Sequence, residues 1–95
     1  MGLRFTWDPA KAETNRRKHA VTFEEALTVF GDPVARIHAD PEHSLGELRE
    51  ILVGHSDRGR LLLVSFTERS RVVRIISARR ATRAEREDHE EGTRI

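Results

Sequence analysis

The stretch LLLVSFTERSRVVRIISARR, residues 61–80, decides the fold of this 95-residue chain. It holds two apolar runs, residues 61–67 and 72–78, joined by the four polar residues 68–71. Runs of this length that are rich in Val, Ile, Leu and Thr are typical of β-strands. A connection this short requires the two strands to be antiparallel. The sequence therefore predicts a β-hairpin over residues 61–78.

The strand pattern extends upstream of this hairpin. Residues 48–55 and 34–38 are two further strand candidates, and turn-forming residues separate them from their neighbours. Before residue 34 the period becomes helical, because apolar residues recur at i, i+3, i+4 and i+7. This stripe, which should face the core, consists of Phe23, Ala26, Leu27 and Phe30.

Start signals mark the remaining elements. Residues 3–7 alternate as a short strand, and Asp8 followed by Pro9 predicts the start of a helix that ends near His19. Thr22 with Glu25, and Thr82 with Glu85, have the spacing of capping boxes. The second of these boxes predicts a short C-terminal helix that ends at residue 92.

The predicted fold class is α+β, with the element order β-α-α-β-β-β-β-α. Successive hairpins predict one twisted antiparallel β-sheet, packed on one face by the two N-terminal helices. The other face is then partly open, with arginines along it. At this length, residues 1–95 form a single domain.

Composition excludes several classes of protein. The chain has no cysteine, which rules out a disulfide scaffold, a thiol nucleophile and zinc sites with sulfur ligands. No segment approaches the ~20 apolar residues of a membrane span. Residues 1–9 lack the apolar run of a signal peptide. We therefore expect a cytoplasmic protein with no membrane partner and no cofactor.

The formal net charge of +1 hides a strong segregation of charge. Residues 58–86 contain nine arginines against two glutamates, a formal charge of +7, while residues 1–57 and 87–91 are both acidic. A GC-rich genome explains the preference for arginine over lysine but not this clustering. A basic face implies an anionic partner, either nucleic acid or an acidic protein.

Within this basic segment, Arg79 and Arg80 lie where the last strand passes into the C-terminal helix. Thr82 follows them and leaves free backbone N–H groups that attract anions. One interpretation is a phosphate clamp for RNA, assisted by Arg60 and by Arg74. The alternative is that Arg79 pairs with Glu85 or another acid, and that Arg80 is merely solvated.

Two residues are the best candidates for proton transfer. Glu68 ends a strand among arginines, which keep it ionised as a base or bind it as an ion pair. His19 ends the first helix and shares one helical face with Lys11, Asn15 and Lys18, of which Lys18 is a candidate RNA-binding residue. A capping or packing histidine is the alternative there. The histidines show no metal-ligand spacing, so no metal site is predicted.

Several motifs in order resemble one known family, the BrnT ribonuclease toxins of bacterial type II toxin–antitoxin systems. They run from residue 5 to residue 86, nearly the whole chain. Position 20 is usually glycine in this pattern and is alanine here. The pattern often has a tyrosine near Asp88 or His89, whereas this chain has no tyrosine. The motifs are Trp7-Asp8-Pro9-x-Lys11-x3-Asn15-x2-Lys18-His19, Val21-x-Phe23-Glu24-Glu25-Ala26, Phe30-x-Asp32-Pro33, Gly59-Arg60-Leu61-Leu62, Thr67-Glu68-Arg69 and Arg74-Ile75-Ile76-Ser77-Ala78-Arg79-Arg80-Ala81.

The resemblance implies a RelE-like small RNase fold and a metal-independent endoribonuclease that halts translation. It also implies a BrnA-type antitoxin, a ribbon-helix-helix DNA-binding protein, whose complex with the toxin represses its own promoter DNA.

Without metal or cysteine, the least demanding reaction is attack by the RNA's own 2′-hydroxyl, which gives a 2′,3′-cyclic phosphate. We assign Arg79 and Arg80 to the clamp, and Glu68 and His19 to the acid and base. The alternative functions are a basic module that binds RNA or protein without chemistry, and a subunit whose main role is antitoxin binding and repression.

Overall fold

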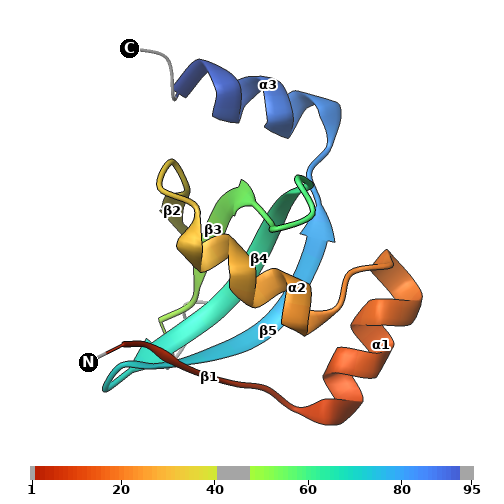
Figure 1. Ribbon diagram of the computed structural model, residues 1–95, viewed down its shortest axis with the longest axis vertical. Coiled ribbons are helices and arrows are strands. Elements are labelled where there is room, and N and C mark those ends of the chain that lie inside the picture. Colours follow the sequence, from red (N-terminus) through yellow and green to blue (C-terminus); the bar gives the residue numbers. More distant parts are fainter. Residues whose placement is uncertain (1, 41–47, 93–95) are drawn as a thin grey trace.

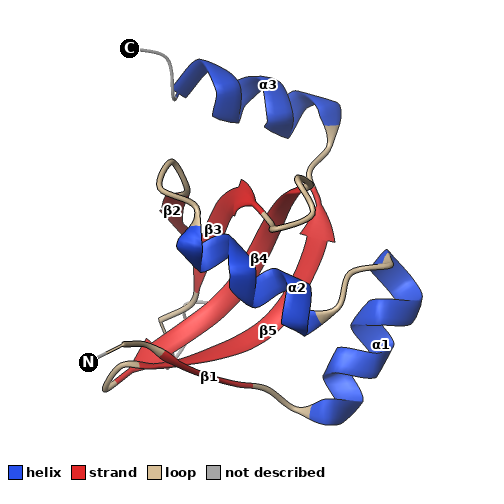
Figure 2. Ribbon diagram, viewed as in Figure 1, coloured by secondary structure: helices blue, strands red, loops and turns tan. Residues whose placement is uncertain are grey.

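The computed structural model describes residues 2–40 and 48–92, and its elements follow the predicted order (Figures 1 and 2). The strands are β1 (Arg4–Thr6), β2 (Arg36–Ala39), β3 (Glu50–His55), β4 (Leu61–Arg69) and β5 (Val72–Arg80). The helices are α1 (Pro9–His19), α2 (Phe23–Thr28) and α3 (Arg83–Gly92), and a 3-10 turn, η1 (Val29–Gly31), follows α2 directly. The predicted turn over residues 40–44 lies, after residue 40, outside the described residues.

The five strands form one sheet in the order β1-β5-β4-β3-β2. β2 to β5 are joined antiparallel, as predicted, but β1 runs parallel to β5 and pairs Arg4 with Val72. The expectation of an antiparallel sheet is therefore wrong, because the sheet is mixed. No hairpin fixes the direction of β1, since its partner lies far along the chain. Instead β1 leads into α1, which packs beside the C-terminal half of β5 (Figure 1).

The hydrophobic core lies between one face of this sheet and the first two helices. We call this the core face, and the opposite one the outer face. Phe23 and Ala26 of the predicted stripe are fully buried, while Leu27 and Phe30 pack at its margin. Ring contacts continue the core to the N-terminus, since Trp7 and Phe23 meet edge to face at 5.9 Å between ring centroids. The sheet contributes Leu52, Leu62, Val64, Phe66, Val73, Ile75 and Ala78.

An irregularity in β5 shapes the surface beside α1. Ser65 pairs with Ser77 but Phe66 pairs with Ile75, so Ile76 is an extra residue, a β-bulge. β1 pairs with β5 only as far as Arg74. The edge of β5 beyond the bulge therefore has no neighbouring strand, and α1 covers it.

The C-terminal helix lies over one end of the outer face (Figure 1). Its predicted capping box is confirmed, because the Thr82 side chain accepts from the Glu85 N–H and the Glu85 carboxylate accepts from the Thr82 N–H. None of the described helices is long and apolar enough to span a membrane.

Candidate functional site

A single buried amide fixes α1 to the free edge of β5. The side chain of Asn15, 6% exposed, accepts from the Ala78 N–H at 3.0 Å and donates to the Ala78 carbonyl at 2.8 Å. It also donates to the Val21 carbonyl at 2.9 Å. Asn15 thus replaces the strand that β5 lacks at this point, satisfying both backbone groups that a neighbouring strand would have paired.

A cleft of about 310 Å³ opens between α1 and β5 around this anchor. Lys18 and His19 line it together, as their shared helical face predicts, and Lys11 adds a second ammonium group. The bulge residue Ile76 and Ser77 form the β5 wall. We call this the α1–β5 cleft. Within residues 2–40 and 48–92, the side chains of Lys18 and His19 have no hydrogen-bond or ion-pair partner, so both are available to a ligand.

Arg79 lies two residues after Ser77, the last cleft residue of β5, and forms a bidentate ion pair with a residue of α3. Its Nη1 and Nη2 atoms donate to the two Glu85 oxygens at 2.8 and 2.7 Å. Arg79 is the main reason that the pKa of Glu85 is lowered to about 2. The pair is partly exposed, so its net contribution to stability is small. The predicted ion pair of Arg79 with Glu85 is thus confirmed, while the role of Arg79 as a phosphate clamp stays a prediction, since a partly exposed pair can exchange its carboxylate for a phosphate.

The structure gathers some of the remaining predicted residues and separates others. Arg80, exposed at the end of β5, has no side-chain partner among the described residues. Glu68 pairs with Val73, seven positions before Arg80 on β5. That is roughly 20 Å of extended strand, so Glu68 does not lie with Arg79 and Arg80. Arg74, exposed near the start of β5, pairs with Thr67 and so lies at the same end as Glu68, away from Arg79 and Arg80.

Arg60 is engaged in the scaffold. It donates through Nε to Glu25 at 2.9 Å and through Nη2 to both Glu25 and the Ala20 carbonyl. Glu25 is only 5% exposed and also accepts from Ser56. The Arg60 hydrogen bonds are the largest cause of the lowered pKa of Glu25. Half of the predicted capping box is thus formed, with Thr22 capping the Glu25 N–H at 3.0 Å, while the Glu25 carboxylate serves Arg60.

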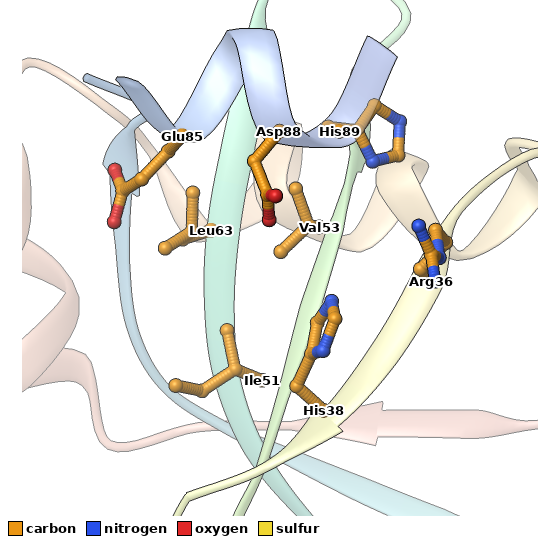
Figure 3. Close-up of a pocket in the computed structure, with 8 residues that line it drawn as sticks. All are labelled: Arg36, His38, Ile51, Val53, Leu63, Glu85, Asp88 and His89. Atoms are coloured by element: carbon orange, nitrogen blue, oxygen red, sulfur yellow. The ribbon is translucent and has the colours of Figure 1, made fainter. Parts of the chain in front are cut away.

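A second cavity, of about 210 Å³, lies between α3 and the outer face. We call it the α3 pocket (Figure 3). Its floor is aliphatic and comes from β3 and β4, and its rim is polar and comes from β2 and α3. The floor consists of Ile51, Val53 and Leu63, and the rim of Arg36, His38, Glu85, Asp88 and His89.

His89 is the least expected residue in this pocket. It is 4% exposed, and neither ring nitrogen has a hydrogen-bond partner among the described residues. Its ring meets that of His55 at 6.0 Å between centroids, and the Nδ1 atom of His55 lies 3.5 Å from Asp32. Burial is the main cause that lowers the pKa of His89, and His55 adds to it.

Sequence reasoning missed the roles of Asn15 and His89. Asn15 carried one signal, since asparagine is a poor residue for a helix interior unless its side chain binds elsewhere. The pattern around His89 carried none, because its burial depends on where α3 docks; only the family resemblance marks this position, near which a tyrosine often stands. No cluster of three or more His, Asp or Glu side chains with metal-binding geometry occurs in the described part of the chain.

Comparison with known proteins identifies the family to which this chain belongs. Residues 7–85 match the family model of BrnT, the ribonuclease toxin of type II toxin–antitoxin systems. The chain belongs to the BrnT family. It is a toxin of a type II system, and its family is one of ribonucleases. The matched span contains the α1–β5 cleft and both clamp arginines, and it ends at Glu85. Asp88 and His89 therefore lie beyond the part that the family model describes.

A solved structure supports the same fold. The chain is similar to the 1.1 Å crystal structure of the Brucella abortus ribonuclease toxin BrnT, with a TM-score of 0.66. The two share 20% sequence identity over 85% of this chain and 99% of that one. No curated protein matches the chain.

Proposed function

We propose that this BrnT-family toxin cleaves RNA in the α1–β5 cleft by attack of the substrate's own 2′-hydroxyl on the adjacent phosphate, without a metal ion. The products are a 2′,3′-cyclic phosphate and a 5′-hydroxyl end. One observation carries the proposal. Lys11 and Lys18 of α1, which have no ion-pair partner in the described part of the chain, border the same cleft as the bulged segment of β5, and Arg79 and Arg80 follow on that strand.

The roles follow from position. Lys18 and Arg79 hold the phosphate, whose charge grows as the 2′-oxygen attacks, and Arg80, which alternates to the other face of β5, adds positive charge at the end of the strand. His19 is the proton-transfer group, because it faces the cleft and imidazole is the side chain that most often acts as a general acid or base. Arg74 extends the basic track along β5.

Two of the predicted site residues do not have their predicted roles in this proposal. Glu68 lies too far along β4 to share a proton with the same phosphate. Arg60 acts as a positioning residue, because it holds the carbonyl of Ala20 and so fixes the end of α1 that carries His19.

The same proposal includes a partner. A type II toxin implies an antitoxin, and we infer a BrnA-type ribbon-helix-helix protein that covers the basic face and binds promoter DNA as a complex. Cleavage of RNA then inhibits translation in the cytoplasm when the antitoxin is lost. We also infer that the fold is of the RelE-like small RNase type.

The test is cleavage of an end-labelled RNA by the purified chain in excess EDTA. We expect cutting to persist, to leave a 2′,3′-cyclic phosphate, and to disappear when the nucleotide before the cut is 2′-deoxy. Loss of cutting in EDTA would contradict the metal-free reaction, and so would cutting of the 2′-deoxy substrate. Retardation of RNA without any cutting would instead identify a binding module.

A further inference from the structure

The α3 pocket combines a flat apolar floor with a carboxylate above it. Ile51, Val53 and Leu63 come from two adjacent strands and present only aliphatic atoms. The carboxylate of Asp88 points down from α3 over this floor (Figure 3). Within the described residues Asp88 has no hydrogen-bond or ion-pair partner. Asp88 is exposed, and its carboxylate accepts hydrogen bonds only, so N–H or O–H groups of a ligand can replace the water around it.

His89 indicates that the pocket is incomplete as it stands. Both of its ring nitrogens are buried and have no partner in the described structure. A neutral imidazole carries one donor and one acceptor. Leaving either of them without a hydrogen-bond partner in a buried site is unfavourable. Native proteins rarely keep such a group without a reason. Because both nitrogens are closed to solvent, a ligand supplies the missing partners only when the His89 ring turns toward the pocket.

The pocket adjoins the proposed clamp. Leu63 of the floor pairs in the sheet with Arg79, about one strand spacing away. Glu85 lines the pocket and also holds the Arg79 guanidinium. A nucleotide whose phosphate lies on Arg79 therefore has its base within reach of this floor.

We propose that the α3 pocket binds a guanine base of the RNA, with Asp88 accepting from the Watson–Crick edge and the aliphatic floor packing against the ring. This inference rests on the proposed ribonuclease function, because it takes the ligand to be RNA. The volume of the α3 pocket is about 210 Å³, which is below the range of about 300–1,000 Å³ typical of pockets for drug-sized ligands. A pocket of this size suits a single heterocycle.

The chemistry of the four bases selects guanine. Its Watson–Crick edge places an N1–H beside an N2 amino group, two donors that match the two oxygens of one carboxylate. Adenine and cytosine place an acceptor beside their amino group, and uracil has one N–H between two carbonyls. Guanine also carries O6 and N7 acceptors that the donors of His38 and Arg36 can serve.

The experiment measures binding and specificity separately from cleavage. The full-length chain is titrated with guanosine, inosine and adenosine 3′-monophosphates while the imidazole resonances of His89 are followed by NMR. Inosine keeps N1–H and lacks the amino group. We expect guanosine monophosphate to bind roughly tenfold more tightly than adenosine monophosphate, the scale of one bidentate contact, with inosine monophosphate between them.

Two variants make the assignment specific. Asp88→Asn should remove the difference between the three nucleotides. Glu91→Gln, an exposed carboxylate on the same helix, should preserve it. Equal binding of all three by the unmodified chain would overturn the proposal, and so would a preference that survives Asp88→Asn or binding that leaves His89 unperturbed.

Cleavage of RNAs that differ only by guanosine or adenosine beside the cut separates the two failures. A chain that cuts both RNAs equally and binds no guanosine monophosphate loses the pocket but keeps the ribonuclease function. A chain that binds guanosine monophosphate as expected but cuts no RNA keeps the pocket and loses the proposed function.

Discussion

Two helices flank β5, and they are held in opposite ways. α1 is attached by Asn15, an uncharged side chain whose hydrogen bonds go to backbone groups. α3 is attached through ionisable groups, namely the Glu85 carboxylate at its start and the His89 imidazole in its middle. At its end, Gly92 lies against the guanidinium of Arg36. The first attachment is buried and independent of pH, while the second depends on charge.

This difference assigns different roles to the two sides of the strand. The α1–β5 cleft belongs to a fixed scaffold, which suits the positioning of a reacting phosphate. The α3 side has partly exposed ion pairs that can rearrange when an anion competes for Arg79. The following substitutions test this contrast, from the largest expected effect to the smallest.

Asn15→Leu should lower the free energy of unfolding by about 4 kcal/mol, because it leaves both backbone groups of Ala78 and the Val21 carbonyl without partners. Urea unfolding followed by circular dichroism measures this. Thr14→Ala, on the exposed side of the same turn, should change it by no more than about 0.5 kcal/mol. Equal effects of the two substitutions would show that the amide does not hold the helix.

The two arginine–glutamate pairs should also differ. Glu25→Gln should cost about 2 kcal/mol, because Arg60 loses its charged partner in a largely buried site. Glu85→Gln should cost less than about 1 kcal/mol, because that pair is exposed to solvent. Paired urea titrations at pH 7 compare them. If Glu85→Gln lowered the free energy of unfolding more than Glu25→Gln does, the α3 side would be the more firmly held of the two, and the contrast between the two sides would be wrong.

Acidification should weaken the α3 side specifically. The pKa of His89 is lowered in the folded state, so the unfolded state binds the proton first, and stability falls as pH drops through 6.5, its usual value. Between pH 7 and 5.5 the loss should reach at most about 1 kcal/mol. His38 and His55 face the same ring, as do Arg36 and Asp32.

His89→Phe isolates the contribution of His89 to this pH dependence. Glu85, with a pKa of about 2, stays ionised throughout the range. Urea titrations at several pH values should therefore give a shallower dependence in the variant. An unchanged slope would mean that His89 does not dock as a neutral ring.

The sequence predicted what depends on local pattern. The hairpin over residues 61–78, the capping box at Thr82 and the common helical face of Lys11, Lys18 and His19 all follow from short-range spacing. The parallel pairing of β1 could not be predicted, because no local turn sets its direction. The α3 pocket could not be predicted either, because it exists only after a C-terminal helix folds back over strands distant in sequence.

Of these substitutions, the one at position 20 should change the stability of the fold least. Ala20 ends α1 with φ 55° and ψ 34°, the left-handed conformation that glycine adopts more easily. Ala20→Gly should therefore raise the midpoint of thermal unfolding slightly, by the equivalent of about 0.5 kcal/mol. It should leave RNA cleavage unaltered, and a lower midpoint would contradict the backbone argument.

The central claim, that Arg79 grips the scissile phosphate, is tested most directly by single-turnover RNA cleavage in EDTA by two variants of one ion pair. Arg79→Ala should reduce the rate by about 100-fold or more, the scale of one lost transition-state contact. Glu85→Gln, which frees the same guanidinium, should not reduce the rate. If the two substitutions slow cleavage equally, or neither does, Arg79 only holds α3 in place and the account of the clamp is wrong.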